Sequence, residues 1–103
     1  MPLPRHLLVV EVSVEPAVEE AWNRWYNEVH VPEIVACPGF RSAARYVSES
    51  AEGRHYIAVY DIDGPQALES AEFNARRGWA EFRDRLQYKT RIYRQITAME
   101  SST

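Results

Sequence analysis

Two segments of this chain share one pattern, a β-branched run that leads into a proline and then into a helix-forming stretch. They are His6–Pro16, with the sequence HLLVVEVSVEP, and His55–Pro65, with the sequence HYIAVYDIDGP. Each run has the length and composition of a strand, and proline fits the first turn of a helix because its missing N–H has no partner there. The repeat therefore predicts two similar halves, each a strand followed by a helix.

Hydrophobic periodicity gives the remaining elements. We expect four strands, at residues 6–14, 40–48, 54–62 and 88–99. The first helix carries a single apolar stripe on one side, made of Val18, Trp22, Trp25 and Val29. A second, irregular helical region starts at Pro65, is interrupted by Gly78 and ends in a short apolar stripe, made of Trp79, Phe82 and Leu86.

The resulting order β-α-β-β-α-β predicts a ferredoxin-like α+β fold in one domain, residues 1–103. Such a fold is a four-stranded antiparallel sheet with its helices on one face. The strand at 54–62 nevertheless has large residues on both sides, with Tyr60 on one and Ile57 and Val59 on the other. An apolar sheet face needs a cover, and the simplest cover is a second copy of the chain. We therefore expect a homodimer, with Tyr60 on the inner face between the subunits.

Three short motifs carry a resemblance to a known family. They are Trp25-Tyr26-Asn27-Glu28-Val29-His30-Val31-Pro32, then Pro38-Gly39-Phe40, then Arg45-Tyr46. In these motifs the chain resembles the EthD-like branch of the dimeric α+β barrel proteins. The resemblance implies a dimeric barrel, and a histidine at the position of His30 as a candidate pocket residue. It implies little about the reaction, since related barrels include cofactor-independent monooxygenases, polyketide cyclases, isomerases and haem-degrading enzymes.

His30 is the strongest catalytic candidate in the sequence. Pro32 cannot donate a helical hydrogen bond, so we expect the first helix to end near His30. Tyr26, four residues earlier, and Glu33, three residues later, then form a polar edge with His30. Histidine suits proton transfer near neutral pH, and a tyrosine can stabilise a developing oxyanion. The alternative is that His30 only caps the C-terminus of the helix.

Other residues are candidates for contact with a ligand. Aromatic side chains could form an apolar wall, and the candidates are Trp22, Trp25, Tyr46, Tyr60, Trp79 and Phe82. Tyr46 and Tyr60 could instead pack across the sheet. Glu11 is either a pocket base or a paired residue of the dimer interface. Cys37, the only cysteine, is expected to be a buried thiol, with a nucleophile as the alternative.

Composition narrows the classes of partner. The net charge of −3 argues against nucleic acid, and no apolar run is long enough for a membrane helix. The N-terminus does not resemble a signal peptide, so we expect a cytoplasmic protein. No nucleotide-binding or metal-binding motif is present, and the second helical region has no histidine to hold haem, so no cofactor and no metal are expected. Basic residues cluster in 74–94, either for salt bridges or as a positive rim that attracts an anion.

These features predict a small cofactor-independent enzyme of the lyase, isomerase or cyclase type. It would act on a small hydrophobic carbonyl or phenolic compound through acid–base chemistry at His30. The alternative is a non-catalytic dimeric protein that binds a ligand or assists a catabolic or biosynthetic pathway. A cofactor-independent monooxygenase, acting through a substrate carbanion, is a third option.

Overall fold

The computed structural model describes residues 3–102 and contains one four-stranded antiparallel sheet. Its strands lie in the order β2-β3-β1-β4, and their bounds are His6–Val14 (β1), Phe40–Ser50 (β2), Gly53–Ile62 (β3) and Leu86–Arg94 (β4). The strand order and the antiparallel pairing are those of a ferredoxin-like α+β fold. The fold predicted from the sequence is thus confirmed.

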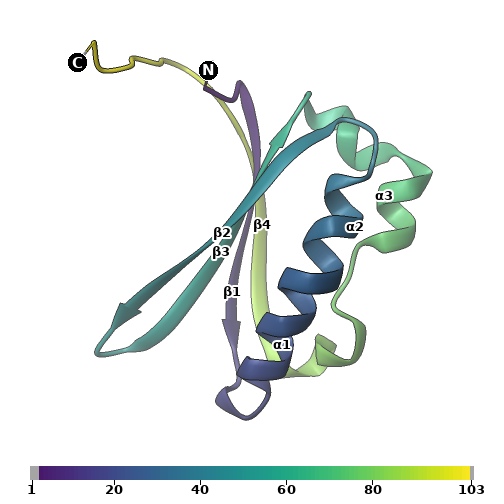
Figure 1. Cartoon of the computed structure of the whole chain (residues 1–103), viewed down its shortest axis with the longest axis vertical. Coiled ribbons are helices and arrows are strands. Elements are labelled where there is room, and N and C mark those ends of the chain that lie inside the picture. The colour runs from purple at the N-terminus through teal and green to yellow at the C-terminus, as the bar shows by residue number, and fades with distance from the viewer. Residues whose placement is uncertain (1–2, 103) are drawn as a thin grey trace.

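The helices form a single layer on one face of the sheet (Figure 1). After β1 come Pro16–Val18 (η1), Glu19–Trp25 (α1), Tyr26–His30 (η2) and Val31–Val35 (α2). After β3 come Pro65–Glu69 (η3), Ala71–Arg76 (α3) and Ala80–Arg85 (η4). The second region alternates between 3-10 and α geometry, as expected from its glycine and short apolar stripes.

The first helix does not end near His30, so that prediction is wrong. The residues Tyr26–His30 form a π-helical turn, and the chain continues as α2 to Val35. A π turn is wider than an α turn, and this helix accommodates Pro32 directly after it. His30 therefore lies within a continuous helix, and the alternative that it caps a helix C-terminus is also wrong.

The π turn changes which side chains face the sheet. The inward residues are Trp22, Tyr26 and His30, and each is at most 6% exposed. Val29, the expected last member of the apolar stripe, is 48% exposed instead. A π turn takes up more residues than an α turn and so rotates the helix face from Val29 to His30.

The two faces of the sheet differ. Leu8, Val10 and Val12 of β1 are buried under the helices, as are Tyr56, Ala58, Tyr60 and Ile62 of β3. Tyr60 is therefore on the helical side, and its predicted place on the face between two subunits is wrong. The uncovered face carries the alternate residues, which include Leu7, Val9, Ile57 and Val59.

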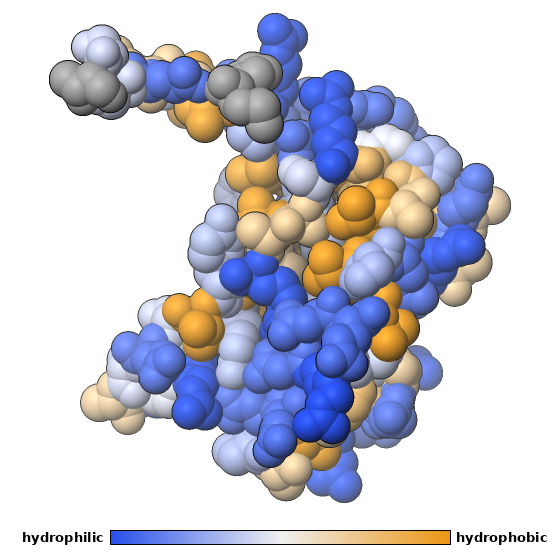
Figure 2. Space-filling view, in the orientation of Figure 1, coloured by the Kyte–Doolittle hydropathy of each residue, from blue (hydrophilic) through white to orange (hydrophobic). Residues whose placement is uncertain are grey.

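The last strand is shorter than predicted and ends at Arg94, not at residue 99. Beyond it the backbone N–H of Gln95 donates to the carbonyl of Arg5, and the chain then runs away from the sheet (Figure 1). Ile96 and Met99 in this segment are 84% and 92% exposed. Figure 2 shows exposed apolar side chains along this segment and also where the helices meet the sheet.

Candidate active site

A cavity of about 90 Å³ lies between the helical layer and the β1–β4 half of the sheet. Its lining residues are Leu8, Val10, Tyr26, His30, Ile34, Tyr60, Leu68, Phe73, Arg77, Gly78, Trp79, Tyr88 and Thr90. Most of the deep residues are apolar or aromatic, whereas Arg77, Tyr88 and Thr90 are exposed and mark the mouth. This cavity has the mostly apolar lining with a few polar groups that small-molecule sites have, but it is smaller than the usual volume of about 300–1,000 Å³.

His30 and Glu33 form a hydrogen-bonded pair beside this cavity. His30 Nδ1 lies 3.0 Å from a carboxylate oxygen of Glu33, and the imidazole stacks on Trp25 with 4.6 Å between ring centres. An ionised carboxylate only accepts hydrogen bonds, so Nδ1 carries the proton. Nε2 has no hydrogen-bond partner within residues 3–102 and is left as the basic nitrogen. Burial lowers the pKa of His30 from its ordinary value of 6.5, and the carboxylate of Glu33 opposes this only in part.

The lowered pKa of His30 makes stability depend on pH. The unfolded chain binds a proton at higher pH than the folded protein does, so the free energy of unfolding falls as pH drops below 6.5. This contribution is present in full above pH 6.5 and is lost as pH falls through the folded-state pKa. Urea unfolding at a series of pH values should show the decrease, and His30→Ala should flatten it. An unchanged slope in the variant would contradict the assignment. The pH range in which His30 changes the free energy of unfolding is separate from that of Glu19. The pKa of Glu19 is lowered from 4.5, so Glu19 affects stability only below that pH.

Two tyrosines face each other at the cavity wall. The hydroxyls of Tyr26 and Tyr60 are 3.2 Å apart, and burial raises the pKa of both. Both hydroxyls are therefore protonated at neutral pH, and the pair has two protons for one mutual hydrogen bond. The second proton can be donated to a ligand in the cavity. The pair thus supplies a donor of the kind that stabilises an oxyanion.

Arg45 supports Tyr26 from the side away from the cavity. Its guanidinium carbon lies 4.2 Å from the centre of the Tyr26 ring and 4.8 Å from that of Trp22. The guanidinium also donates to the side-chain oxygens of Asn23 and Asn27, at 2.9 and 2.7 Å. Planar stacking and these two hydrogen bonds hold the first helix against β2 and so fix the position of the Tyr26 ring.

Trp79 closes one side of the cavity. Its ring lies 5.8 Å from that of Tyr26 and 5.1 Å from that of Tyr88. The residues on either side have positive φ, at 119° for Gly78 and 52° for Ala80. Ala80 is the one non-glycine residue with positive φ in the described chain, a conformation that costs about 1–2 kcal/mol. A positive-φ glycine before Trp79 and a strained alanine after it therefore present this ring to the cavity.

Gly78→Ala is expected to displace Trp79. A Cβ at Gly78 would meet no atom within 4 Å, so the penalty, about 1–3 kcal/mol, comes from the backbone alone. Gly53→Ala is a matched control, because Gly53 also has positive φ and open space but is the first residue of β3, far along the chain from Trp79. Both variants should lose similar stability in urea unfolding. Only Gly78→Ala should change the tryptophan emission and weaken ligand binding, and equal effects of the two variants would contradict this role for Trp79.

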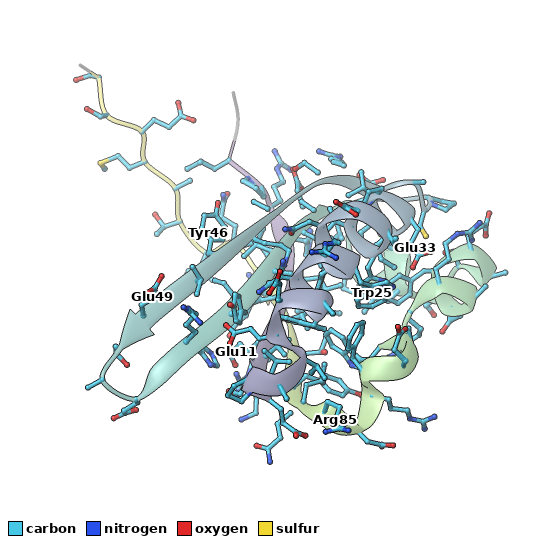
Figure 3. The ribbon with its side chains drawn as sticks, turned by 60° about the horizontal axis from the view of Figure 1, so that its bottom comes forward. Glu11, Trp25, Glu33, Tyr46, Glu49 and Arg85 are labelled. Atoms are coloured by element: carbon cyan, nitrogen blue, oxygen red, sulfur yellow. The ribbon has the colours of Figure 1, made fainter. Side chains whose placement is uncertain are left out.

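The structure brings together only part of the predicted set. His30, Tyr26, Tyr60 and Trp79 line the cavity, while Trp25 and Glu33 contact His30 from behind. Trp22 and Phe82 are buried but do not line it. Tyr46 and Glu11 lie elsewhere, and Figure 3 shows Tyr46 on the β2 ribbon, apart from Trp25 and Glu33 on the helical side.

Glu11 belongs to a separate polar group on the uncovered sheet face. It accepts a hydrogen bond of 3.0 Å from Arg91, and His55 lies 3.9 Å away. Glu11 is therefore a paired residue on this face and does not line the cavity. Cys37 is buried, its thiol donates to the carbonyl of Glu33, and burial raises its pKa, so it is not placed or activated as a nucleophile.

Several lining residues were missed by the sequence analysis. They are Leu8, Val10, Ile34, Leu68, Phe73, Arg77, Gly78, Tyr88 and Thr90. The signal that could have found two of them is strand alternation, because Tyr88 pairs with Val12 and Thr90 with Val10, whose side chains face the helices. For Arg77, the signal was the basic cluster in residues 74–94.

Metal and membrane features can be stated for the described residues. Among residues 3–102 no group of three or more His, Cys, Asp or Glu side chains could hold a metal ion. Within the same range, no helix has the length and apolar character needed to cross a bilayer.

The fold is a ferredoxin-like α+β fold, and the cavity lies between its helical layer and its sheet. Over residues 5–101 the chain matches, and it belongs to, the family described as a domain of unknown function, DUF4286. None of the curated proteins matches it. Solved structures confirm, at the level of fold, the resemblance to EthD-like proteins.

Three such structures are similar over most of their length. An EthD family protein from Bacillus halodurans has 18% identity and a TM-score of 0.67, covering 88% of this chain and 99% of its own. A monooxygenase from the gene ActVA-Orf6 of Streptomyces coelicolor, in complex with nanaomycin D, has 18% identity and a TM-score of 0.62. The match covers 96% of this chain and 94% of the monooxygenase. SnoaB, a cofactor-independent oxygenase from Streptomyces nogalater, has 10% identity and a TM-score of 0.68. The match covers 94% of this chain and 99% of SnoaB. The TM-scores show a shared fold.

Proposed function

We propose that the protein is a cofactor-independent enzyme that removes a proton from a small hydrophobic carbonyl or phenolic compound. The observation that carries the proposal is the His30–Glu33 pair beside a cavity that also presents the Tyr26 and Tyr60 hydroxyls. A base and an oxyanion donor in one apolar cavity are the two parts that enolate or phenolate formation requires.

In the proposed step, His30 Nε2 accepts a proton from a carbon next to the carbonyl of the substrate. The electrons of the broken C–H bond move into the carbonyl group, and its oxygen becomes an enolate oxygen. The free hydroxyl proton of the Tyr26–Tyr60 pair is donated to this oxygen as a hydrogen bond. Glu33 accepts from Nδ1–H and stabilises the imidazolium that forms. Return of the proton to another carbon of the substrate completes an isomerisation. In a cyclisation, the enolate carbon attacks a second carbonyl carbon of the same substrate, the electrons of that C=O bond move to its oxygen, and this oxygen takes the proton from His30 Nε2.

A second candidate function is oxygenation, and the similar folds of two enzymes described as oxygenases favour it. The first step would be the same, and the substrate carbanion would then react with molecular oxygen. Oxygen consumption with the substrate separates this reaction from isomerisation or cyclisation. A protein that binds the same ligand without turnover would show neither reaction.

The test begins with native mass spectrometry of the freshly purified protein, to identify a small molecule that remains bound. That compound is then incubated in deuterium oxide with the protein, and deuterium at the carbon next to its carbonyl is measured. We expect exchange to be faster than with His30→Ala. Equal rates for the two proteins would contradict an enzymatic role and leave the non-catalytic binding protein.

We also propose that two chains pair through the uncovered sheet face. The face contains half-buried Leu7, Val9, Ile57 and Val59, and exposed apolar residues continue at Tyr46 and Tyr93. These apolar residues form a patch beside the polar group of Glu11, Arg91 and His55, and an exposed apolar patch often marks an interaction site. A homodimer related by twofold symmetry would cover it with the same face of the other copy.

A further inference from the structure

The cavity has a one-sided charge. Arg77 is the only permanently charged side chain among its lining residues, and no Asp or Glu side chain is among them. The nearest carboxylate described above, that of Glu33, lies behind the imidazole of His30 and is occupied by it. A cation therefore finds no oppositely charged side chain in the lining, whereas an anion finds Arg77.

Arg77 lies at the mouth of the cavity and has no carboxylate as an ion-pair partner within residues 3–102. It follows α3, and its guanidinium lies 5.5 Å from the centre of the Phe73 ring, another lining residue. Some other arginines of residues 3–102 are ion-paired, for example Arg85 with Glu15 and Arg91 with Glu11, whereas Arg83, like Arg77, has no carboxylate partner in this range. No ion pair or hydrogen bond of the Arg77 side chain is found within the same range. The stacked guanidinium therefore has its donors available at the entrance.

The surroundings of this entrance keep its charge positive. The adjoining hollow is lined by Arg77, Arg83 and Asp84 together with Trp79 and Tyr88. Two arginines against one aspartate leave a net positive charge beside the opening. One available guanidinium matches a monoanion, since its planar donors fit the two oxygens of a carboxylate.

We propose that the ligand is a small organic anion whose carboxylate pairs with Arg77 while its unsaturated body enters the cavity. The inference rests on the proposed function and gives it a substrate class. The orientation follows from the cost of desolvation, because a carboxylate at the exposed mouth keeps part of its hydration. The opposite orientation would bring a carboxylate toward Glu33. An aromatic ring behind the carboxylate reaches Phe73 and Trp79, and its carbonyl or hydroxyl group is directed at His30 and the tyrosine pair.

The test compares two probes of the same size and shape, benzoate and benzamide, by calorimetry at about pH 7.5, above the ordinary range of histidine titration. Benzoate should bind more tightly than benzamide, by roughly two- to fivefold, the range expected for an ion pair that is open to solvent. Arg77→Gln should remove this preference and leave benzamide unchanged. Arg76→Gln is the matched control: it removes the same charge from the neighbouring residue, which does not line the cavity. Added salt should reduce the preference of the unmodified protein.

The outcomes separate this inference from the proposed function. The proposal that the ligand is an anion is overturned if benzamide binds as well as benzoate, or if Arg76→Gln and Arg77→Gln have the same effect. The proposed function of the cavity is not affected by either result. The anionic substrate class and the proposed function are both overturned if neither probe binds at millimolar concentration and neither shifts the imidazole resonances of His30 in an NMR titration. Support requires the benzoate preference, its loss in Arg77→Gln and its retention in Arg76→Gln.

Discussion

Turnover of the co-purified compound is expected to fall by about 10²- to 10⁴-fold when His30 is replaced by alanine, the usual contribution of a positioned proton-transfer group. The variant loses the basic Nε2 atom, and no other basic side chain lines the deep part of the cavity within residues 3–102. His30 also stacks on Trp25 and is only 6% exposed, so stability should fall as well. Deuterium exchange rates and urea unfolding, measured on the same samples, separate the two effects.

Two further variants distinguish a catalytic loss from a packing loss. His55→Ala removes a half-exposed histidine on the other sheet face and should leave turnover unchanged. Glu33→Gln keeps the shape of the side chain and an oxygen for Nδ1–H, but removes the charge that stabilises an imidazolium. It should give an intermediate rate with nearly normal stability. A normal rate in both His30→Ala and Glu33→Gln would rule out the proposed proton transfer.

The tyrosine pair makes a distinct prediction. Tyr26→Phe and Tyr60→Phe each leave one hydroxyl, whose proton is then free for the ligand, so each single variant should lose little activity. The double variant has no donor at this wall and should lose about 10²- to 10³-fold, the cost of removing an oxyanion donor. Exchange rates of the three variants test this. Additive losses from the two single changes would contradict a shared, interchangeable donor.

The fold was predictable because the alternation of residues in the strand sequences matches the alternation of buried and more exposed side chains in the structure. The burial of Leu8, Val10 and Val12 follows the sequence pattern residue by residue. The end of the last strand was not predictable from propensity, since residues 95–99 continue the apolar pattern but lack a neighbouring strand to pair with. The inner face was misassigned because alternation separates the two sides of a strand without saying which side the helices cover.

The helical half of the site was predictable only in part. The spacing of Tyr26, His30 and Glu33 brought the three residues together correctly, because each interval is close to one helical turn. The stripe through Val29 was wrong because a π turn has no clear sequence signal, and it changes the phase of every later residue. Arg77 and Thr90 were missed because their contribution depends on a loop and on strand register, neither of which is a local property of the sequence.

Val59→Glu is expected to convert the proposed dimer into a monomer. Val59 lies on the uncovered face at the centre of the sheet, paired with Val9 on one side and Ala44 on the other. In a single chain the new carboxylate would point to water at little cost. In a twofold dimer two carboxylates would be buried without partners, which costs several kcal/mol for each.

Sedimentation equilibrium at micromolar concentration measures the effect. The unmodified protein should have twice the chain mass of 11.9 kDa, and Val59→Glu should have the single mass with an unchanged circular dichroism spectrum. Ala75→Glu adds the same charge on exposed α3, on the helical side, and should remain dimeric. Val59→Lys should dissociate as well, which excludes simple repulsion from Glu11 on the same face. A soluble monomer of the unmodified chain, or a Val59→Glu variant that remains dimeric, would show that this face is not the interface.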